Sequence, residues 1–384
     1  MVAIGSGNHE PIEDVALFLF PFCLLDTHIV SDCFHCTLLS SFCKSRFALD
    51  MRAWYNGTRI TSACGALYRD KEDLMRPAVW TAFYAELDLH KALQLLSEHG
   101  WRAFEASTEH LVRIELDQHP DERIAQARQC LVDLDLDMPQ AHALLQADVA
   151  NPDPDRRGQD IDRLAHHIRL AAQLGVQVVV MHPGGRQAAT TCAERDRVKA
   201  LNVEAFRRLG DVAGEHGVQI GLENLMRRGA STPYDMLDLL AAIDHPAIGI
   251  TLDTSHANVV GLELPTVIRE FGPYLIATHI SDNDGSGDQH LVPGNGNIDW
   301  APVMEALGAA SYDGLFNLEI PGERHRNLVL RGLKSQHACR VAEWLLSLYK
   351  GVLYVRTIHS RHCSKAGGKL CLRAHDSRAG RAGS

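Results

Sequence analysis

The sequence lacks the glycine-rich signatures of the common nucleotide-binding α/β proteins. No GxGxxG follows the first expected strand, and GxxxxGK[ST] occurs nowhere in the 384 residues, which argues against dinucleotide and P-loop sites. The apolar run VALFLFPFCLL, from Val15 to Leu25, is too short to span a bilayer. It follows acidic residues and has no basic segment before it, so a signal peptide is not expected either.

The ten cysteines lack the spacing of a disulfide framework. Five fall within the first 64 residues, three are scattered through the middle of the chain and two lie near its end. We therefore expect a reducing, cytoplasmic setting. Cys33 and Cys36, close to His28 and His35, could be written as a zinc site, but no second pair follows at zinc-finger spacing.

The charge is distributed unevenly along the chain. Residues 76–350 carry 38 acidic and 25 basic side chains, whereas residues 351–384 carry 7 basic and 1 acidic. An acidic body disfavours nucleic acid as the main partner, because a polyanion requires cationic contacts. The 46% hydrophobic content is that of a globular protein that can bury a sizeable core, and no membrane partner is expected.

The chain divides into three regions that differ in hydrophobic periodicity and composition. Residues 1–75 lack clear periodicity and are expected to form an irregular N-terminal extension. Residues 351–384 are small, basic and turn-rich, as in a disordered tail. The regular pattern lies between them, in residues 76–350, and the fold is inferred from that region alone.

Short apolar segments alternate there with stretches of helical length, which predicts a parallel sheet covered by helices. Eight such units in about 275 residues favour a closed (β/α)8 TIM barrel over an open doubly wound sheet. The strands are expected in VWTAFYA, WRAFEAS, QAHALLQ, VQVVVMH, VQIGLEN, IGITLDT, LIATHIS and LFNLEIP. The last helix is expected at Leu333–Leu348.

Six of the expected strands carry or end in side chains that can bind a metal. They are separated by 40, 41, 30, 26 and 40 residues, about one strand and helix unit each. The strand ends of a barrel form a ring at the C-terminal face, so these side chains should converge. A single such residue is more often a cap or turn residue, but six at matched positions indicate a site. The six are His142, His182, Glu223, Asp253, His279 and Glu319.

Three of these six side chains are carboxylates, which would repel one another at the mouth of an apolar barrel. A divalent cation removes that conflict. Mixed histidine and carboxylate ligands suit Mn²⁺ or Zn²⁺, with Co²⁺ or Mg²⁺ also compatible. The sequence therefore predicts a metal centre built from strand ends.

The segments GLEN, LDTSHA, HISDNDG…DQHLVPGNGNIDW and LEI carry a resemblance to a known family. Across residues 78–348 the sequence resembles the xylose-isomerase-like TIM barrels, which include sugar and sugar-phosphate isomerases and epimerases. The resemblance implies that Glu223, Asp253, His279 and Glu319 hold one metal, and that Glu223 and Glu319 are also the acid/base pair. It implies chemistry on a ketose through a metal-stabilised enediolate, with His256 contacting substrate oxygens.

The same superfamily contains the type IV apurinic endonucleases, zinc phosphodiesterases that act on abasic DNA. Their larger ligand set for three zinc ions also has counterparts here, so additional metal or substrate contacts are expected. The counterparts outside the first metal set are His142, His182, His256, Asp288 and His290. The acidic body argues against DNA. A barrel that binds metal or sugar without turnover is a third hypothesis, which the presence of both glutamates disfavours.

The segment from His279 to Trp300 opens with DNDGSG, the first half of a calcium loop. The position that requires a bidentate glutamate is Pro293, which excludes an EF-hand. We expect Asp282 and Asp284 to brace the loop instead, with Gly294 and Gly296 allowing a tight turn. A homodimer is compatible with such barrels, although the sequence carries no coiled-coil signal.

Overall fold

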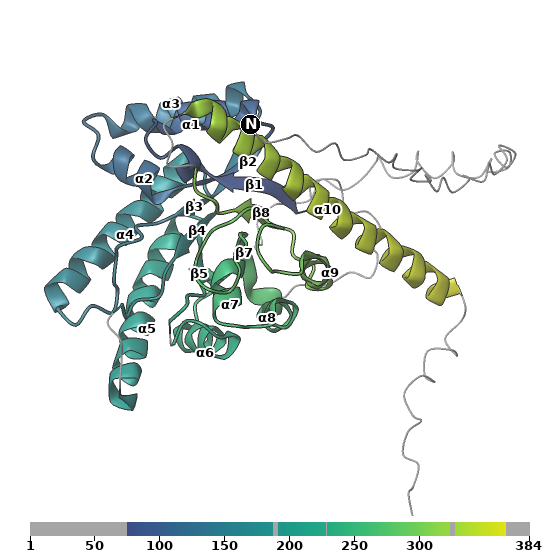
Figure 1. The fold of residues 1–384 in the computed structure, drawn as a ribbon. Coiled ribbons are helices and arrows are strands. Elements are labelled where there is room, and N and C mark those ends of the chain that lie inside the picture. The colour runs from purple at the N-terminus through teal and green to yellow at the C-terminus, as the bar shows by residue number, and fades with distance from the viewer. Residues whose placement is uncertain (1–74, 187–190, 228, 323–326, 366–384) are drawn as a thin grey trace, which may run out of the picture. The chain divides into compact units, whose positions relative to one another are not determined.

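The computed structural model describes residues 75–186, 191–227, 229–322 and 327–365, with side chains described up to residue 348. Residues 1–74 and 366–384 lie outside the described residues. The expected N-terminal extension, the segment around Cys33 and Cys36, and the end of the expected basic tail therefore stay predictions. Within the described part of the chain, helices surround an eight-stranded sheet (Figure 1).

The sheet is parallel throughout, in the strand order β7-β6-β5-β4-β3-β2-β1-β8. Its two edges meet just beyond β7, where the Ile280 N–H donates to Asn317 O at 2.8 Å and the Glu319 N–H donates to Ile280 O at 3.1 Å. This meeting closes the sheet and confirms the predicted TIM barrel. The strands are β1 (Arg76–Trp80), β2 (Ala103–Ala106), β3 (Asp137–His142), β4 (Val178–Met181), β5 (Gln219–Glu223), β6 (Ile248–Asp253), β7 (Leu275–His279) and β8 (Leu315–Leu318).

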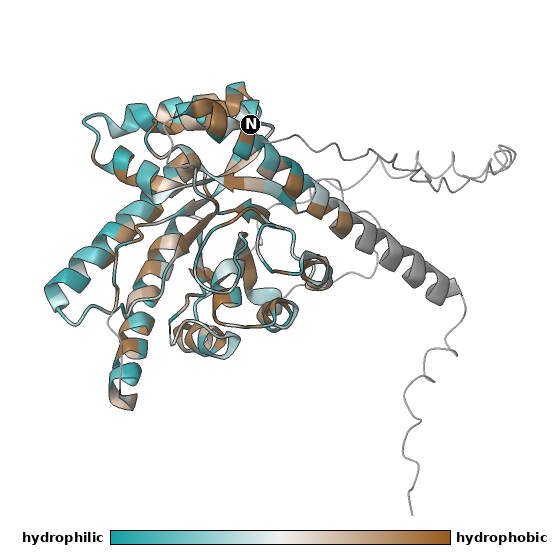
Figure 2. Cartoon of the chain, in the orientation of Figure 1, coloured by the Kyte–Doolittle hydropathy of each residue, from teal (hydrophilic) through white to brown (hydrophobic). Residues whose placement is uncertain are grey.

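The helices pack an apolar face on the sheet and expose a polar one, so hydrophilic and hydrophobic residues alternate along them (Figure 2). None of the described helices is both long and apolar enough to cross a bilayer. The α-helices are α1 (Leu89–Glu98), α2 (Thr108–Glu115), α3 (Pro120–Asp133), α4 (Pro154–Leu174), α5 (Cys192–Glu215), α6 (Pro233–Ile243), α7 (Thr254–Val259), α8 (Leu264–Phe271), α9 (Trp300–Ala309) and α10 (Leu328–Lys365). Two 3₁₀ turns, η3 (Thr81–Tyr84) and η4 (Gly272–Tyr274), complete the set.

Several boundaries differ from the sequence expectation. The first strand ends at Trp80 and is followed by η3, where Thr81 Oγ1 accepts the Ser107 N–H at 2.9 Å. The third strand starts at Asp137, before the expected Gln140. Helix α2 was not anticipated, and α10 starts before Leu333 and continues past residue 350.

The barrel interior is partly polar in the layer of side chains just below the strand ends. Gln140, Thr251 and Asn317 are buried inside the sheet, each two residues before a candidate ligand that points the same way. A Cβ on Gly221 would lie 2.2 Å from Thr251 Oγ1, so this position requires glycine. The apolar core lies between the sheet and the helices, where Phe104 and Phe206 are fully buried.

One buried histidine ties the first two βα loops together. His110 Nε2 donates to Leu87 O at 3.1 Å, and its Nδ1 lies 2.9 Å from Thr81 Oγ1 and 3.1 Å from Ser107 Oγ. These contacts suit a neutral imidazole that donates once and accepts from hydroxyl groups. Burial lowers the pKa of His110 to about 4.

We predict that His110→Gln changes the pH dependence of stability. Between pH 6.5 and 4 only the unfolded chain takes up this proton, so the free energy of unfolding falls by up to about 1.4 kcal/mol per pH unit as the pH is lowered. The variant loses that contribution. Its deficit at pH 7, about 1–2 kcal/mol, should therefore shrink towards pH 4 in urea titrations. Parallel wild-type and variant curves would contradict this account, and His337→Gln, at an exposed position, is the control.

Candidate metal centre

Four buried side chains meet where the last four strands end. Glu223, Asp253 and His279 are the final residues of β5, β6 and β7, and Glu319 directly follows β8. One ligand atom from each lies within 4.8 Å of those from the other three. The structure thus brings together the four residues that the sequence suggested as a first metal set. A second overlapping group joins His142 to Glu223 and His279.

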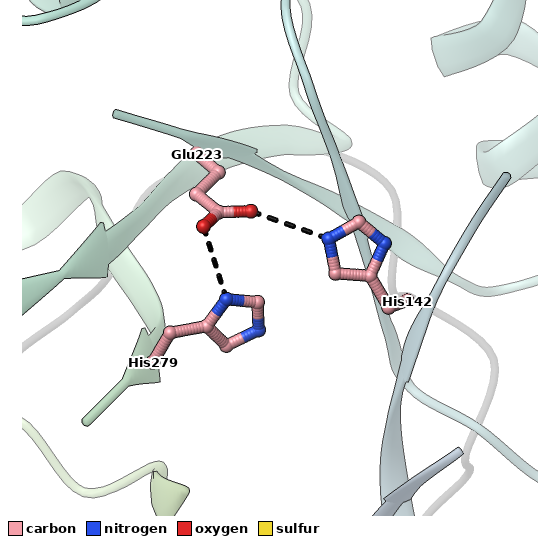
Figure 3. Close-up of side chains that lie close together, drawn as sticks. All are labelled: His142, Glu223 and His279. Atoms are coloured by element: carbon pink, nitrogen blue, oxygen red, sulfur yellow. Dashed lines mark hydrogen bonds and ion pairs between the residues drawn. The ribbon is translucent and has the colours of Figure 1, made fainter. Parts of the chain in front are cut away.

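The Glu223 carboxylate lies at the centre of these contacts. Its Oε1 is 3.1 Å from His279 Nδ1, and its Oε2 is 2.9 Å from His182 Nε2 and 3.3 Å from His142 Nε2. Figure 3 shows the carboxylate facing the rings of His142 and His279. Although burial raises the pKa of Glu223, the surrounding imidazoles, chiefly His279 and His182, lower it well below its usual range.

Two carboxylate oxygens in the centre have no hydrogen-bond partner. Asp253 Oδ2 and Glu319 Oε2 are both buried, and the 3.0 Å approach of His279 Nδ1 to Glu319 Oε2 does not have hydrogen-bond geometry. Burial raises the pKa of Asp253 to about 7; His256 opposes this shift and the Glu223 and Glu319 charges add to it. Unpaired buried oxygens are costly, and a divalent cation would satisfy both. The side chains present therefore fit a metal.

Three histidines are oriented by the backbone. The Nδ1 atoms of His142, His256 and His290 each lie 2.8 Å from a carbonyl oxygen, those of Ala143, Asn224 and Glu319 respectively. When Nδ1–H donates to a carbonyl, Nε2 keeps its lone pair free for a metal. This is the arrangement expected of histidine ligands.

A second cluster lies on the rim beside the first. Asp288 Oδ2 is 3.0 Å from His290 Nε2 and 3.5 Å from His256 Nε2. His256 also approaches the first centre, with Nδ1 3.5 Å from Glu223 Oε1. Although burial lowers the pKa of both histidines, neighbouring carboxylates raise it to about 11 for His256 and about 10 for His290. The nine site residues expected from the sequence thus lie in two adjoining clusters, which His256 connects.

The loop after β7 is held by Asp282. Its carboxylate accepts the backbone N–H of Gly294 at 2.8 Å and of Ile298 at 3.2 Å, and the indole N–H of Trp300 at 3.0 Å. A Cβ on Gly296 would lie 2.3 Å from Asn283 O, so the tight turn requires glycine there. The bracing role predicted for Asp282 matches these contacts. The exposed Asp284 is hydrogen-bonded to Ser286 in the same loop.

Two residues were missed by the sequence reasoning. Glu105 on β2 is fully buried, and its Oε2 lies 3.0 Å from His279 Nε2. Asn224 exchanges two hydrogen bonds with the backbone of Asp253, at 2.8 and 3.0 Å, which fixes the end of β6. Glu105 could have been recognised in the sequence as a carboxylate in the middle of the apolar segment WRAFEAS.

Residues 93–343 match the xylose isomerase-like TIM barrel family, and the chain belongs to it. An uncharacterized protein of Methanocaldococcus jannaschii is 34% identical over 157 residues, which cover 40% of this chain and 53% of that protein. The D-psicose 3-epimerase of Ruminiclostridium cellulolyticum is 31% identical over 121 residues, which cover 31% of this chain and 40% of the enzyme. The match thus spans about half, or less, of the length of these relatives.

Among solved structures, a D-tagatose 3-epimerase-like protein superimposes with a TM-score of 0.61. The alignment covers 73% of this chain and all of that protein, at 22% sequence identity. At this identity the likeness demonstrates the shared fold and leaves substrate and reaction to be argued from the site.

We predict that Mn²⁺ or Zn²⁺ stabilises the chelator-treated protein. A ligand at about 100 times its dissociation constant adds about 2.7 kcal/mol, which raises the unfolding temperature by several degrees. Asp253→Asn should abolish most of that increase, because it removes one anionic ligand, while Asp196→Asn on the exposed surface of α5 should retain it. Differential scanning calorimetry with and without metal measures the shift, and an equal shift in both variants would exclude Asp253 as a ligand.

Proposed function

We propose that the protein is a divalent-metal-dependent isomerase or epimerase of a sugar or sugar phosphate. The observation that carries the proposal is the buried cluster of Glu223, Asp253, His279 and Glu319 at the C-terminal face of the barrel, where enzymes of this fold carry their active sites. The family and the epimerase among the matched relatives support it. Mn²⁺ and Zn²⁺ are the proposed metals.

Glu223 and Glu319 are the proposed proton carriers. Although burial raises the pKa of Glu319, His279 lowers it to about 2, and the pKa of Glu223 is lowered as well. Either side chain can therefore serve as the carboxylate that accepts a proton. Glu223 ends β5 and Glu319 directly follows β8. These strands are not neighbours in the sheet, so we expect the two side chains to approach a bound molecule from different directions.

The proton transfer needs one group on each side of the reacting carbon. One glutamate, as a carboxylate, accepts the proton next to the substrate carbonyl and becomes a carboxylic acid. The other glutamate, protonated from solvent before the step, delivers its proton to the opposite face for epimerisation, or to the neighbouring carbon for isomerisation, and becomes a carboxylate. A divalent cation, when bound, polarises the carbonyl and so acidifies that C–H bond. Asp253 and His279 are the other proposed ligands of that cation, and His256 is the proposed contact to substrate oxygens.

A zinc phosphodiesterase acting on abasic DNA is the second candidate. The observation in its favour is the additional cluster of His256, Asp288 and His290 beside the first centre, which could hold a further metal. The acidic balance of residues 76–350 opposes it, because a DNA groove must neutralise phosphates.

The test is a side-by-side assay of the metal-reconstituted protein on free ketoses, ketose phosphates and an abasic-site duplex. We expect exchange of a substrate carbon-bound proton with solvent deuterium, followed by NMR, for at least one sugar. Glu223→Gln and Glu319→Gln should each lower kcat about 10²–10⁴-fold, while Glu305→Gln on the exposed face of α9 leaves it unchanged. Duplex cleavage without sugar exchange would replace this proposal by the second candidate.

A further inference from the structure

The ring of His279 is oriented differently from those of His142, His256 and His290. His142, His256 and His290 are fixed by carbonyl oxygens through Nδ1. In His279 the Nδ1 atom faces the centre instead, 3.1 Å from Glu223 Oε1 and 3.0 Å from Glu319 Oε2. Its Nε2 atom points away from the centre, to Glu105 Oε2 at 3.0 Å. The Glu105 side chain therefore accepts a hydrogen bond from the His279 ring, as backbone carbonyls do from the rings of His142, His256 and His290.

Glu105 is itself held in place. It lies on β2, opposite Gln140 on β3, and Gln140 Nε2 donates to the same Oε2 atom that faces His279. Glu105 and His279 are both fully buried, so water does not compete for this contact. The other carboxylate oxygen, Oε1, has no hydrogen-bond partner. Burying a carboxylate oxygen without a hydrogen bond is costly, so the contact with His279 is the feature of Glu105 that calls for an explanation.

We propose that Glu105 is a positioning residue for the metal centre. By accepting the Nε2–H of His279, it keeps the proton on Nε2 and leaves the lone pair of Nδ1 directed at the cation. The negative charge also strengthens the imidazole as a donor, as carboxylates behind histidine ligands do in metal sites. The inference rests on the metal dependence in the proposed function, and it assigns a role outside the residues that contact metal or substrate.

Two substitutions separate orientation from charge. Glu105→Gln keeps an oxygen that can accept from His279 and Gln140 but removes the charge, so metal affinity should fall about 10-fold. Glu105→Met fills the same volume without an acceptor and should cost about 100-fold. The order of affinities should be wild type, Gln, Met.

The matched control is Glu115, which accepts from His167 Nε2 at 3.3 Å and from Arg163 at 2.7 Å outside the metal centre. Glu115→Gln makes the same chemical change to a carboxylate–histidine pair. It should lower the unfolding temperature and leave metal affinity unchanged. A purely structural Glu105 would behave in the same way.

Affinity for Zn²⁺ is measured without substrate, by competition with a chromophoric chelator, and the d–d spectrum of the Co²⁺ form reports the ligand geometry. The expected result is the ordered loss of affinity together with an altered Co²⁺ spectrum in both Glu105 variants. Wild-type affinity and spectrum in folded Glu105→Gln would overturn the inference, even if Glu105→Met fails to fold. A wild-type protein that binds no metal would overturn the proposed function as well, whereas metal binding without sugar turnover leaves the role of Glu105 intact.

Discussion

The site is organised by the burial of negative charge at one end of the barrel. Glu223, Asp253 and Glu319 are within a few ångströms of one another and are almost fully inaccessible to water, an arrangement that is unstable unless cations offset it. The imidazoles around Glu223 supply part of that compensation. The oxygens of Asp253 and Glu319 that lack a hydrogen bond mark where it remains incomplete, and this is the place where a metal fits.

The position of these groups follows from the strands. Inward-facing positions recur every second residue along a strand, so the last inward position of each strand lies at the rim of the barrel. The polar residues one layer below, such as Thr251 and Asn317, show that the change from apolar core to reactive mouth is gradual. Backbone carbonyls orient His142, His256 and His290 at the rim, so no further side chains are needed to hold these rings.

The sequence was sufficient for the barrel and for the residues that gather at its mouth. Periodicity reveals strands and helices, and a charged residue at a strand end is easy to recognise in Glu223 or Asp253. Glu105 was missed because its role depends on a contact between β2 and β7, 174 positions apart along the chain. The turn η3 was missed because it is accompanied by a tertiary hydrogen bond, that of Ser107 to Thr81, which leaves no periodic pattern in the sequence. The helix α2 does have a buried face, with His110, Leu111 and Ile114, but its eight residues are too few for periodicity to be decisive.

Two of the candidate ligands lie at the place where the barrel closes. The seam between β7 and β8 is joined by the backbone of Ile280, Asn317 and Glu319 just beyond the end of β7, whereas the other neighbouring strands pair at three or more residue positions. His279 and Glu319 stand on opposite sides of that seam. A cation bound by both residues would therefore link the two edges of the sheet. Occupancy of the site would then contribute to the stability of the barrel wall as well as to the chemistry at its mouth.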